Sequence, residues 1–210
     1  MVVYSLTIGP MGTNCYIVET EDKNAIAIDV GGDAKEVIDF LKTKDLKLKK
    51  IFLTHGHYDH FYGVDELAKV TDSEVYVHKL DSSKLTSASE SLATYMNGLK
   101  FNPVSTFIEV DENDEILLDE LSFKVIHTPG HTVGSCCFIG ESVIFSGDTL
   151  FRLNVGRTDF PGGSYKQLLQ SLKKLDSIES TYKIYPGHDR ESDLDYEKKH
   201  NAYIKESRNA

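Results

Sequence analysis

The sequence lacks the features of several protein classes. It has no tryptophan, only three cysteines, and no apolar run long enough to span a bilayer. Residues 1–6 lack the basic region and the long apolar core of a secretory signal. We therefore expect a cytoplasmic protein without a membrane partner.

The three cysteines are too few and too badly placed for a disulfide framework. They are odd in number, and Cys136 and Cys137 are neighbours, while Cys15 stands alone in another apolar run. We expect buried free thiols in a reducing compartment. A catalytic thiol is the alternative, and it would need partial exposure and a nearby base.

Positive charge is also scarce, with 23 Lys and Arg against 33 Asp and Glu, for a net charge of −10. Most of such a surface repels polyanions, which disfavours a nuclease or a nucleic-acid partner. The expected partner is a small molecule, and the chain is expected to be a monomer or a homodimer.

The remaining composition fits one globular domain covering residues 1–210, with 40% hydrophobic residues and aromatic bulk from 11 Tyr and 10 Phe. No linker or repeat divides the chain. Apolar patterning predicts alternating strands and helices, and hence sheets with helices outside, an α/β or α+β domain. The predicted strands cover 2–8, 14–19, 24–29, 50–53, 74–77, 107–110, 115–118, 123–127, 135–139, 142–145 and 182–185. The predicted helices cover 34–44, 63–70, 81–99, 164–175 and 194–205.

Residues 54–60, Thr-His-Gly-His-Tyr-Asp-His, hold the densest group of potential metal ligands. The apolar run 51–53 precedes them and a predicted helix follows, so they lie on a loop at the end of a strand. Imidazole and carboxylate groups are the usual protein ligands of zinc and related divalent metals. A solvated polar loop is the alternative, but it does not account for this density.

Three later loops follow the same pattern, in which an apolar strand ends in a potential ligand beside glycine or proline. Seven side chains on these four loops are predicted ligands: His55, His57, Asp59, His60, His131, Asp148 and His188. Seven exceed the needs of one tetrahedral zinc but suit two metals that share a bridge. Asp148 is assigned the bridge, because a carboxylate can bind through both oxygens.

The H-x-H-x-D-H motif followed by single His, Asp and His residues resembles the metallo-β-lactamase superfamily over nearly the whole chain. This resemblance implies a four-layer αβ/βα sandwich. It also implies one metal held by His55, His57 and His131, and a second held by Asp59, His60 and His188. Asp148 would lie between the two metals.

Within that superfamily, residues 147–151 and 156–160 resemble the glyoxalase II group, the hydroxyacylglutathione hydrolases. Residues 156–159 resemble the persulfide dioxygenases as well. The β-lactamases fit less well, because a lone Asp148 between two metals is the hydrolase pattern. Since only 22 residues follow His188, we expect no separate C-terminal glutathione-binding domain. The resemblance is therefore to the short bacterial hydrolases, and the thiol is left open.

The hypothesis that follows is a metallohydrolase with two divalent ions, zinc first and iron or manganese as alternatives. A metal-bridging hydroxide would attack a thioester such as S-lactoylglutathione or a related acyl-thiol, with Asp59 and Asp148 as catalytic residues. Arg157 and Tyr58 are predicted substrate contacts, although Arg157 is equally suited to pairing with Asp159.

The alternative activity is that of an iron-dependent persulfide dioxygenase, which would use His55, His131 and Asp148. A phosphodiesterase or RNase of the same superfamily comes third, because the acidic composition disfavours it. A metal-binding scaffold without turnover is the remaining alternative.

Overall fold

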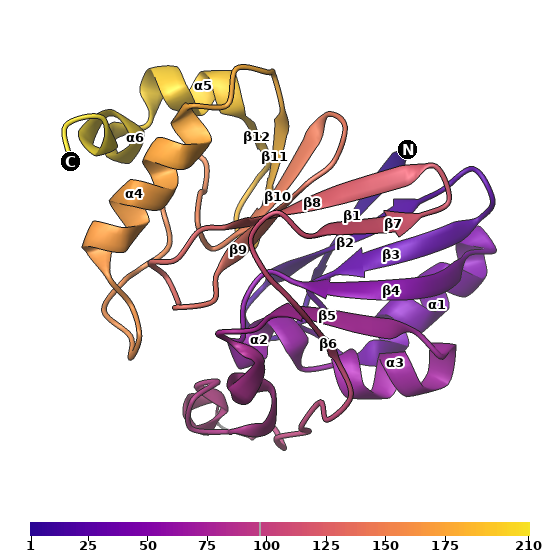
Figure 1. The fold of residues 1–210 in the computed structure, drawn as a ribbon. Coiled ribbons are helices and arrows are strands. Elements are labelled where there is room, and N and C mark those ends of the chain that lie inside the picture. The colour runs from indigo at the N-terminus through magenta and orange to yellow at the C-terminus, as the bar shows by residue number, and fades with distance from the viewer. Residues whose placement is uncertain (97) are drawn as a thin grey trace.

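A computed structural model describes residues 1–96 and 98–210, which form two six-stranded sheets (Figure 1). The first sheet has the order β1 to β6: Val2–Ile8, Thr13–Glu19, Asn24–Ile28, Lys47–Leu53, Glu74–His78 and Ile108–Val110. The second has the order β12 to β7: Ser192–Asp193, Lys183–Pro186, Val143–Gly147, Cys136–Ile139, Leu121–His127 and Glu115–Leu118.

Helices cover the outer face of each sheet. Helices α1 (Ala34–Lys44) and α3 (Val64–Thr71) pack on the first sheet, and the short α2 (Tyr58–Phe61) lies in the loop after β4. Helices α4 (Tyr165–Asp176), α5 (Leu194–His200) and α6 (Ala202–Ser207) pack on the second sheet (Figure 1). The order helix, sheet, sheet, helix confirms the predicted four-layer sandwich.

Side chains that point alternately to the two faces of each strand join the layers of this sandwich. In β4, Ile51 and Leu53 pack with the helices of the first half, whereas Phe52 belongs to the cluster between the sheets. Because successive side chains of a strand point to opposite faces, a continuous apolar run is what a strand buried on both faces requires. Tyr and Phe fill the space between the sheets; Phe52 stacks on Phe138 with ring centroids 4.7 Å apart.

Most predicted elements are confirmed within a few residues. Helix α1 has the predicted bounds, and Asp33 caps it by accepting a 2.9 Å hydrogen bond from the Lys35 backbone N–H. The predicted helix 194–205 is instead two helices. Asn201 breaks it with an extended backbone (φ −69°, ψ 123°), and its side chain accepts from the Tyr203 N–H to cap α6.

The predicted helix over 81–99 is wrong. The described part of this segment holds only two short 3₁₀ helices, η1 (Ser82–Thr86) and η2 (Ala93–Tyr95), and Asn97 lies outside the described residues. Leu92 adopts a left-handed conformation (φ 63°), which interrupts any continuous helix. Serine also favours turns over helix interiors, because its hydroxyl competes for backbone groups.

The three cysteines are buried free thiols, as predicted. Burial raises the pKa of Cys15 and Cys136 above the usual range and raises that of Cys137 to about 11. Such thiols are protonated at neutral pH, which argues against a nucleophilic cysteine. Within the described residues, no helix combines the length and the hydropathy that crossing a bilayer requires.

The stack between Phe52 and Phe138 should carry much of the contact between the sheets. Phe52→Ala is expected to lower the free energy of unfolding by about 3–5 kcal/mol, because it leaves a cavity at a fully buried position. Chemical denaturation of the metal-free protein measures this. Leu117→Ala, at a side chain that is 62% exposed, is the control and should change stability by less than ~0.5 kcal/mol. Equal effects of the two substitutions would contradict the assigned core.

Candidate metal centre

The seven predicted ligands come from loops that meet at one end of the two sheets. Strand β4 leads to His55 and His57, and α2 carries Asp59 and His60. The other three follow β8, β10 and β11. Strands β10 and β11 are parallel neighbours, so the loops after them leave the sheet at the same edge.

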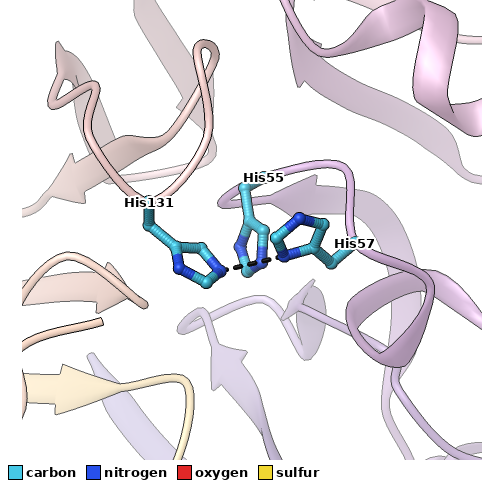
Figure 2. Close-up of side chains that lie close together, drawn as sticks. All are labelled: His55, His57 and His131. Atoms are coloured by element: carbon cyan, nitrogen blue, oxygen red, sulfur yellow. Dashed lines mark hydrogen bonds between the residues drawn. The ribbon is translucent and has the colours of Figure 1, made fainter. Parts of the chain in front are cut away.

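His55, His57 and His131 form the first group of potential ligands. Their ring nitrogens lie within 4.8 Å of one another, and all three side chains are buried. Figure 2 shows the three imidazoles turned toward one another, with His57 Nδ1 only 2.9 Å from His131 Nε2. This matches the composition implied for the first metal site.

Asp59, His60 and His188 form the second group, also within 4.8 Å. His188 Nε2 lies 3.3 Å from His60 Nε2 and 3.4 Å from Asp59 Oδ2. Asp59 and His188 keep about a fifth of their side-chain surface exposed, whereas His60 is fully buried. The second group therefore opens toward solvent more than the first.

Asp148 lies between the two groups. Its Oδ2 is 3.5 Å from His131 Nε2 and 3.8 Å from His188 Nε2, and its Oδ1 is 3.5 Å from His60 Nε2. One carboxylate thus approaches a member of the first group and members of the second. This is the position that a bridging ligand requires.

Two buried atoms at the centre, His55 Nε2 and Asp148 Oδ1, have no hydrogen-bond partner among the described residues. Buried polar atoms in folded proteins almost always have partners, so such orphans call for an explanation. A lone-pair nitrogen and a carboxylate oxygen directed at a shared space fit a divalent cation. The donor set of imidazoles and carboxylates suits zinc, iron or manganese.

The outer nitrogens of the histidines are held by neighbouring groups. His131 Nδ1 donates to the Arg157 carbonyl at 2.7 Å, which leaves Nε2 free to bind a cation. His60 Nδ1 lies 2.9 Å from Asp29 Oδ2. Such outer contacts fix the tautomer and the orientation of a metal-binding imidazole.

A glycine permits the close approach of the last loop. A Cβ on Gly187 would lie 2.3 Å from Asp148 Oδ1 and 2.7 Å from His60 Cε1. No other residue can occupy this position without displacing two of the potential ligands.

Comparison with known proteins decides the family. A family model described as "Metallo-beta-lactamase superfamily" matches residues 8–188. The chain belongs to the metallo-beta-lactamase superfamily. This agrees with the two stacked sheets and with the ligand-bearing loops at one end of them.

Relatives within the superfamily include proteins of different described activity. The hydroxyacylglutathione hydrolase GloC of Haemophilus influenzae is 34% identical over 198 residues, which cover 91% of this chain and 92% of GloC. The structure of the B3 metallo-beta-lactamase BLEG-1 matches with a TM-score of 0.91 at 31% identity, covering 97% of this chain and 99% of that one. The di-iron form of TTHA1623 matches with a TM-score of 0.85 at 34% identity, covering 95% and 99%. The superfamily and its metallohydrolase chemistry are thus shown, whereas the substrate is not.

The prediction that Tyr58 contacts substrate is not supported by its position. The ring is 1% exposed and packs against Phe61 and Phe101. Its hydroxyl donates to the Lys100 carbonyl and accepts from the Asn102 N–H. Tyr58 is the first residue of α2, and its side chain packs into the core cluster and not into the centre.

Arg157 lies beside the centre but is already paired. Its Nε and Nη2 donate to the two carboxylate oxygens of Asp159, both at 2.7 Å. The alternative weighed from the sequence, pairing within the loop, is therefore what the structure shows. Arg157 still lines a cavity of about 490 Å³ beside the centre.

Two buried carboxylates that the sequence did not single out hold the ligand loops. Asp29 accepts from the Thr54 N–H and hydroxyl as well as contacting His60. It follows strand β3 directly and precedes two glycines, so the strand-end pattern that marked the other loops applied here too. Asp81 begins the segment 81–99 that was predicted as a helix, and no local pattern there marked it as a buried acceptor.

Asp81 joins the two loops that carry the first ligand group. It is fully buried and accepts from the Gly56 N–H at 2.8 Å, the Thr132 hydroxyl at 2.6 Å and the Gly134 N–H at 3.0 Å. Gly56 lies between His55 and His57, and Thr132 follows His131. One carboxylate therefore fixes the distance between both halves of the first group.

Removal of this carboxylate should damage both stability and metal binding. Asp81→Ala leaves three donors without their acceptor, so the free energy of unfolding should fall by about 2–4 kcal/mol. Metal affinity should fall ~10–100-fold, as for other residues that orient ligands. Asp81→Asn retains one acceptor oxygen and should lie between wild type and alanine. Denaturation of metal-free protein and competition with a chelator measure the two effects; unchanged values for alanine would refute the role.

Protonation differs between the two ligand groups. Burial lowers the pKa of His55, and burial together with His131 lowers that of His57 to about 2. Burial also opposes charge on His60, but the carboxylates of Asp148, Asp29 and Asp59 outweigh it and raise its pKa to about 10. His55 and His57 are thus neutral at neutral pH, whereas His60 holds a proton.

Metal binding to the second group should therefore depend on pH. Below about pH 10 His60 is protonated, and a cation must displace that proton to bind. We expect affinity for the ion at Asp59, His60 and His188 to rise about tenfold per pH unit between pH 7 and 9. His55 and His57 are already neutral in this range, so they should add no pH dependence to the affinity for the ion of the first group. Proton release measured in weak buffer during metal titration tests this, and release of no protons by either ion would contradict it.

Proposed function

We propose that this chain is a metal-dependent hydrolase of a small-molecule thioester, of the acyl-thiol type that includes S-lactoylglutathione. The observation that carries the proposal is Asp148 between two groups of three potential ligands. That arrangement suits a pair of cations, and the similarity to GloC supports a thioester substrate. Zinc is the first choice for both ions, with iron and manganese as alternatives.

The seven side chains have distinct proposed roles. His55, His57 and His131 would hold one ion, Asp59, His60 and His188 the other, with Asp148 shared. Two divalent ions bound there supply a water of lowered pKa and a positive charge for the developing oxyanion. Their ligands are rigidly placed, because four of the five histidines are almost fully buried.

Asp59 and the leaving group complete the proposed mechanism. Burial opposes charge on Asp59, but His60 and His188 outweigh it and lower its pKa, so the carboxylate is ionised at neutral pH. Asp59 borders the cavity and would accept a hydrogen bond from the attacking water, holding its lone pair toward the carbonyl carbon. A thiolate leaving group, with a thiol pKa of ~8.5, requires little help from an acid.

An iron-dependent persulfide dioxygenase is the second candidate. His131 Nε2 lies 3.5 Å from Asp148 Oδ2, and His55 shares a group with Asp148, so the two histidines and the carboxylate that this activity needs are close together. A similar structure also exists in a di-iron-bound form. The hydrolase remains preferred, because four further potential ligands would have no role in a mononuclear site.

Metal content measured together with turnover separates the two candidates. The hydrolase predicts two ions per chain and thioester hydrolysis, and Asp148→Ala should lower kcat about a hundredfold or more. The folded state should persist, because Asp148 Oδ1 has no protein partner to lose. Asp39→Ala, on the exposed face of α1, is the matched control and should keep full activity.

The contradicting results are equally specific. One iron per chain with oxygen uptake on a persulfide would replace the hydrolase by the dioxygenase. An unchanged hydrolysis rate for Asp148→Ala would show that the bridge assignment is wrong.

A further inference from the structure

The wall of the cavity beside the candidate metal centre is apolar. Outside the potential ligands it is lined mainly by aromatic and aliphatic side chains from three separate segments: Met11, Tyr95, Met96, Phe151, Val155 and Phe160. Met11 comes from the turn between β1 and β2, Tyr95 and Met96 from η2 and its end, and the rest from the loop after β10. Apolar walls around a few polar groups are typical of small-molecule sites.

The described lining offers no free cation to an anionic substrate. Apart from the potential ligands, Arg157 is its only charged residue. Asp159 takes the Nε/Nη2 edge of this guanidinium with both of its carboxylate oxygens and offsets its charge, and the guanidinium lies 4.0 Å from the centre of the Phe160 ring. A glutathione conjugate brings two carboxylates, and neither would find an unpaired guanidinium or ammonium here.

The mouth of the cavity exposes apolar groups that a ligand would cover. Tyr95 is 78% exposed and Met11 is 59% exposed, both well above what their hydrophobicity favours. Methionine adapts its shape to different apolar ligands, since its side chain is unbranched and flexible. Covering this surface with an apolar group would contribute to binding in proportion to the area removed from water.

The segment that carries Tyr95 is attached to the metal loop. The Tyr58 N–H donates to the Ser91 carbonyl at 2.9 Å, and Ser91 and Leu92 also line the cavity. Leu92 takes a left-handed conformation (φ 63°) immediately before η2. A bulky residue adopts this conformation only where surrounding contacts enforce it, and such strain concentrates at binding sites.

We propose that the cavity takes a thioester in which an apolar acyl group is joined to an uncharged thiol, in preference to a glutathione conjugate. The proposal rests on the thioester hydrolase activity proposed above. In the reaction the bond between the acyl carbon and sulfur breaks. The hydroxyl of water joins the acyl carbon, and its proton goes to the sulfur or to solvent.

Paired substrates test the proposal. The metal-loaded protein is assayed with S-hexanoyl-N-acetylcysteamine, S-hexanoylglutathione and the two corresponding acetyl thioesters. We expect kcat/KM to be about tenfold or more higher for the N-acetylcysteamine ester of each pair. We also expect a rise of about tenfold or more from acetyl to hexanoyl.

A variant of the wall adds a second comparison. Tyr95→Ser combined with Met96→Ser should lower kcat/KM for the hexanoyl ester about tenfold through KM, with the acetyl ester nearly unchanged. Tyr165→Ser is the matched control, since Tyr165 lies on α4 and bonds to Glu206, away from the cavity. The midpoint of unfolding checks that both variants fold.

Failure of this inference and failure of the hydrolase proposal give different results. Equal or faster hydrolysis of the glutathione esters overturns the inference and leaves the thioesterase intact. If no thioester is hydrolysed, the hydrolase proposal fails. Binding of the thioethers S-hexyl-N-acetylcysteamine and S-hexylglutathione, measured by calorimetry, then decides the inference. Tighter binding of the neutral thioether supports it, whereas equal binding, or none, overturns it.

Discussion

The structure depends on compensating the desolvation of many polar groups at one end of two sheets. His55, His57, His60, His131 and Asp148 are all buried, together with Asp29 and Asp81. Burying such groups without partners costs several kcal/mol each. The outer nitrogens of three histidines are satisfied by hydrogen bonds: that of His60 donates to the Asp29 carboxylate, that of His131 donates to the Arg157 carbonyl, and that of His55 bonds with the Thr54 hydroxyl. The inner atoms are left for a cation.

The two buried carboxylates hold the ligand loops in place at the end of the sheets. Asp29 connects the end of β3 to Thr54 and His60, and Asp81 connects the His55–His57 loop to the loop after His131. Each carboxylate accepts three hydrogen bonds, so ligand positions that are far apart in sequence are fixed by short contacts. The rigid sheets supply the frame, and these carboxylates adjust the loops on it.

The cavity beside the centre links this frame to the choice of substrate. Its polar side is made by the potential ligands, and its other side by Tyr95, Met96, Phe151 and Phe160. Pairing of Arg157 with Asp159 removes the one positive charge that would favour a carboxylate. The ligand loops fix where a cation would bind, whereas this wall shapes the space beside it.

The sequence by itself predicted most of the elements and singled out the seven potential ligands that the fold brings together. The spacing of apolar residues and the length of the apolar runs sufficed to predict β1, α1 and α4. The potential ligands were found by their place after a strand, beside glycine or proline. Both signals are local in the sequence. The predicted helix over 81–99 was wrong, and the burial of Tyr58 does not support the predicted substrate contact, because both depend on what packs against these residues. Only the tertiary structure decided that Asp81 joins two ligand loops and that Tyr95 reaches the cavity. The pairing of Arg157 with Asp159, two residues away, was one of the alternatives that the sequence offered. The hydrogen bonds of Asp81 join it to residues up to 53 positions away, and no local pattern encodes an acceptor at such a distance.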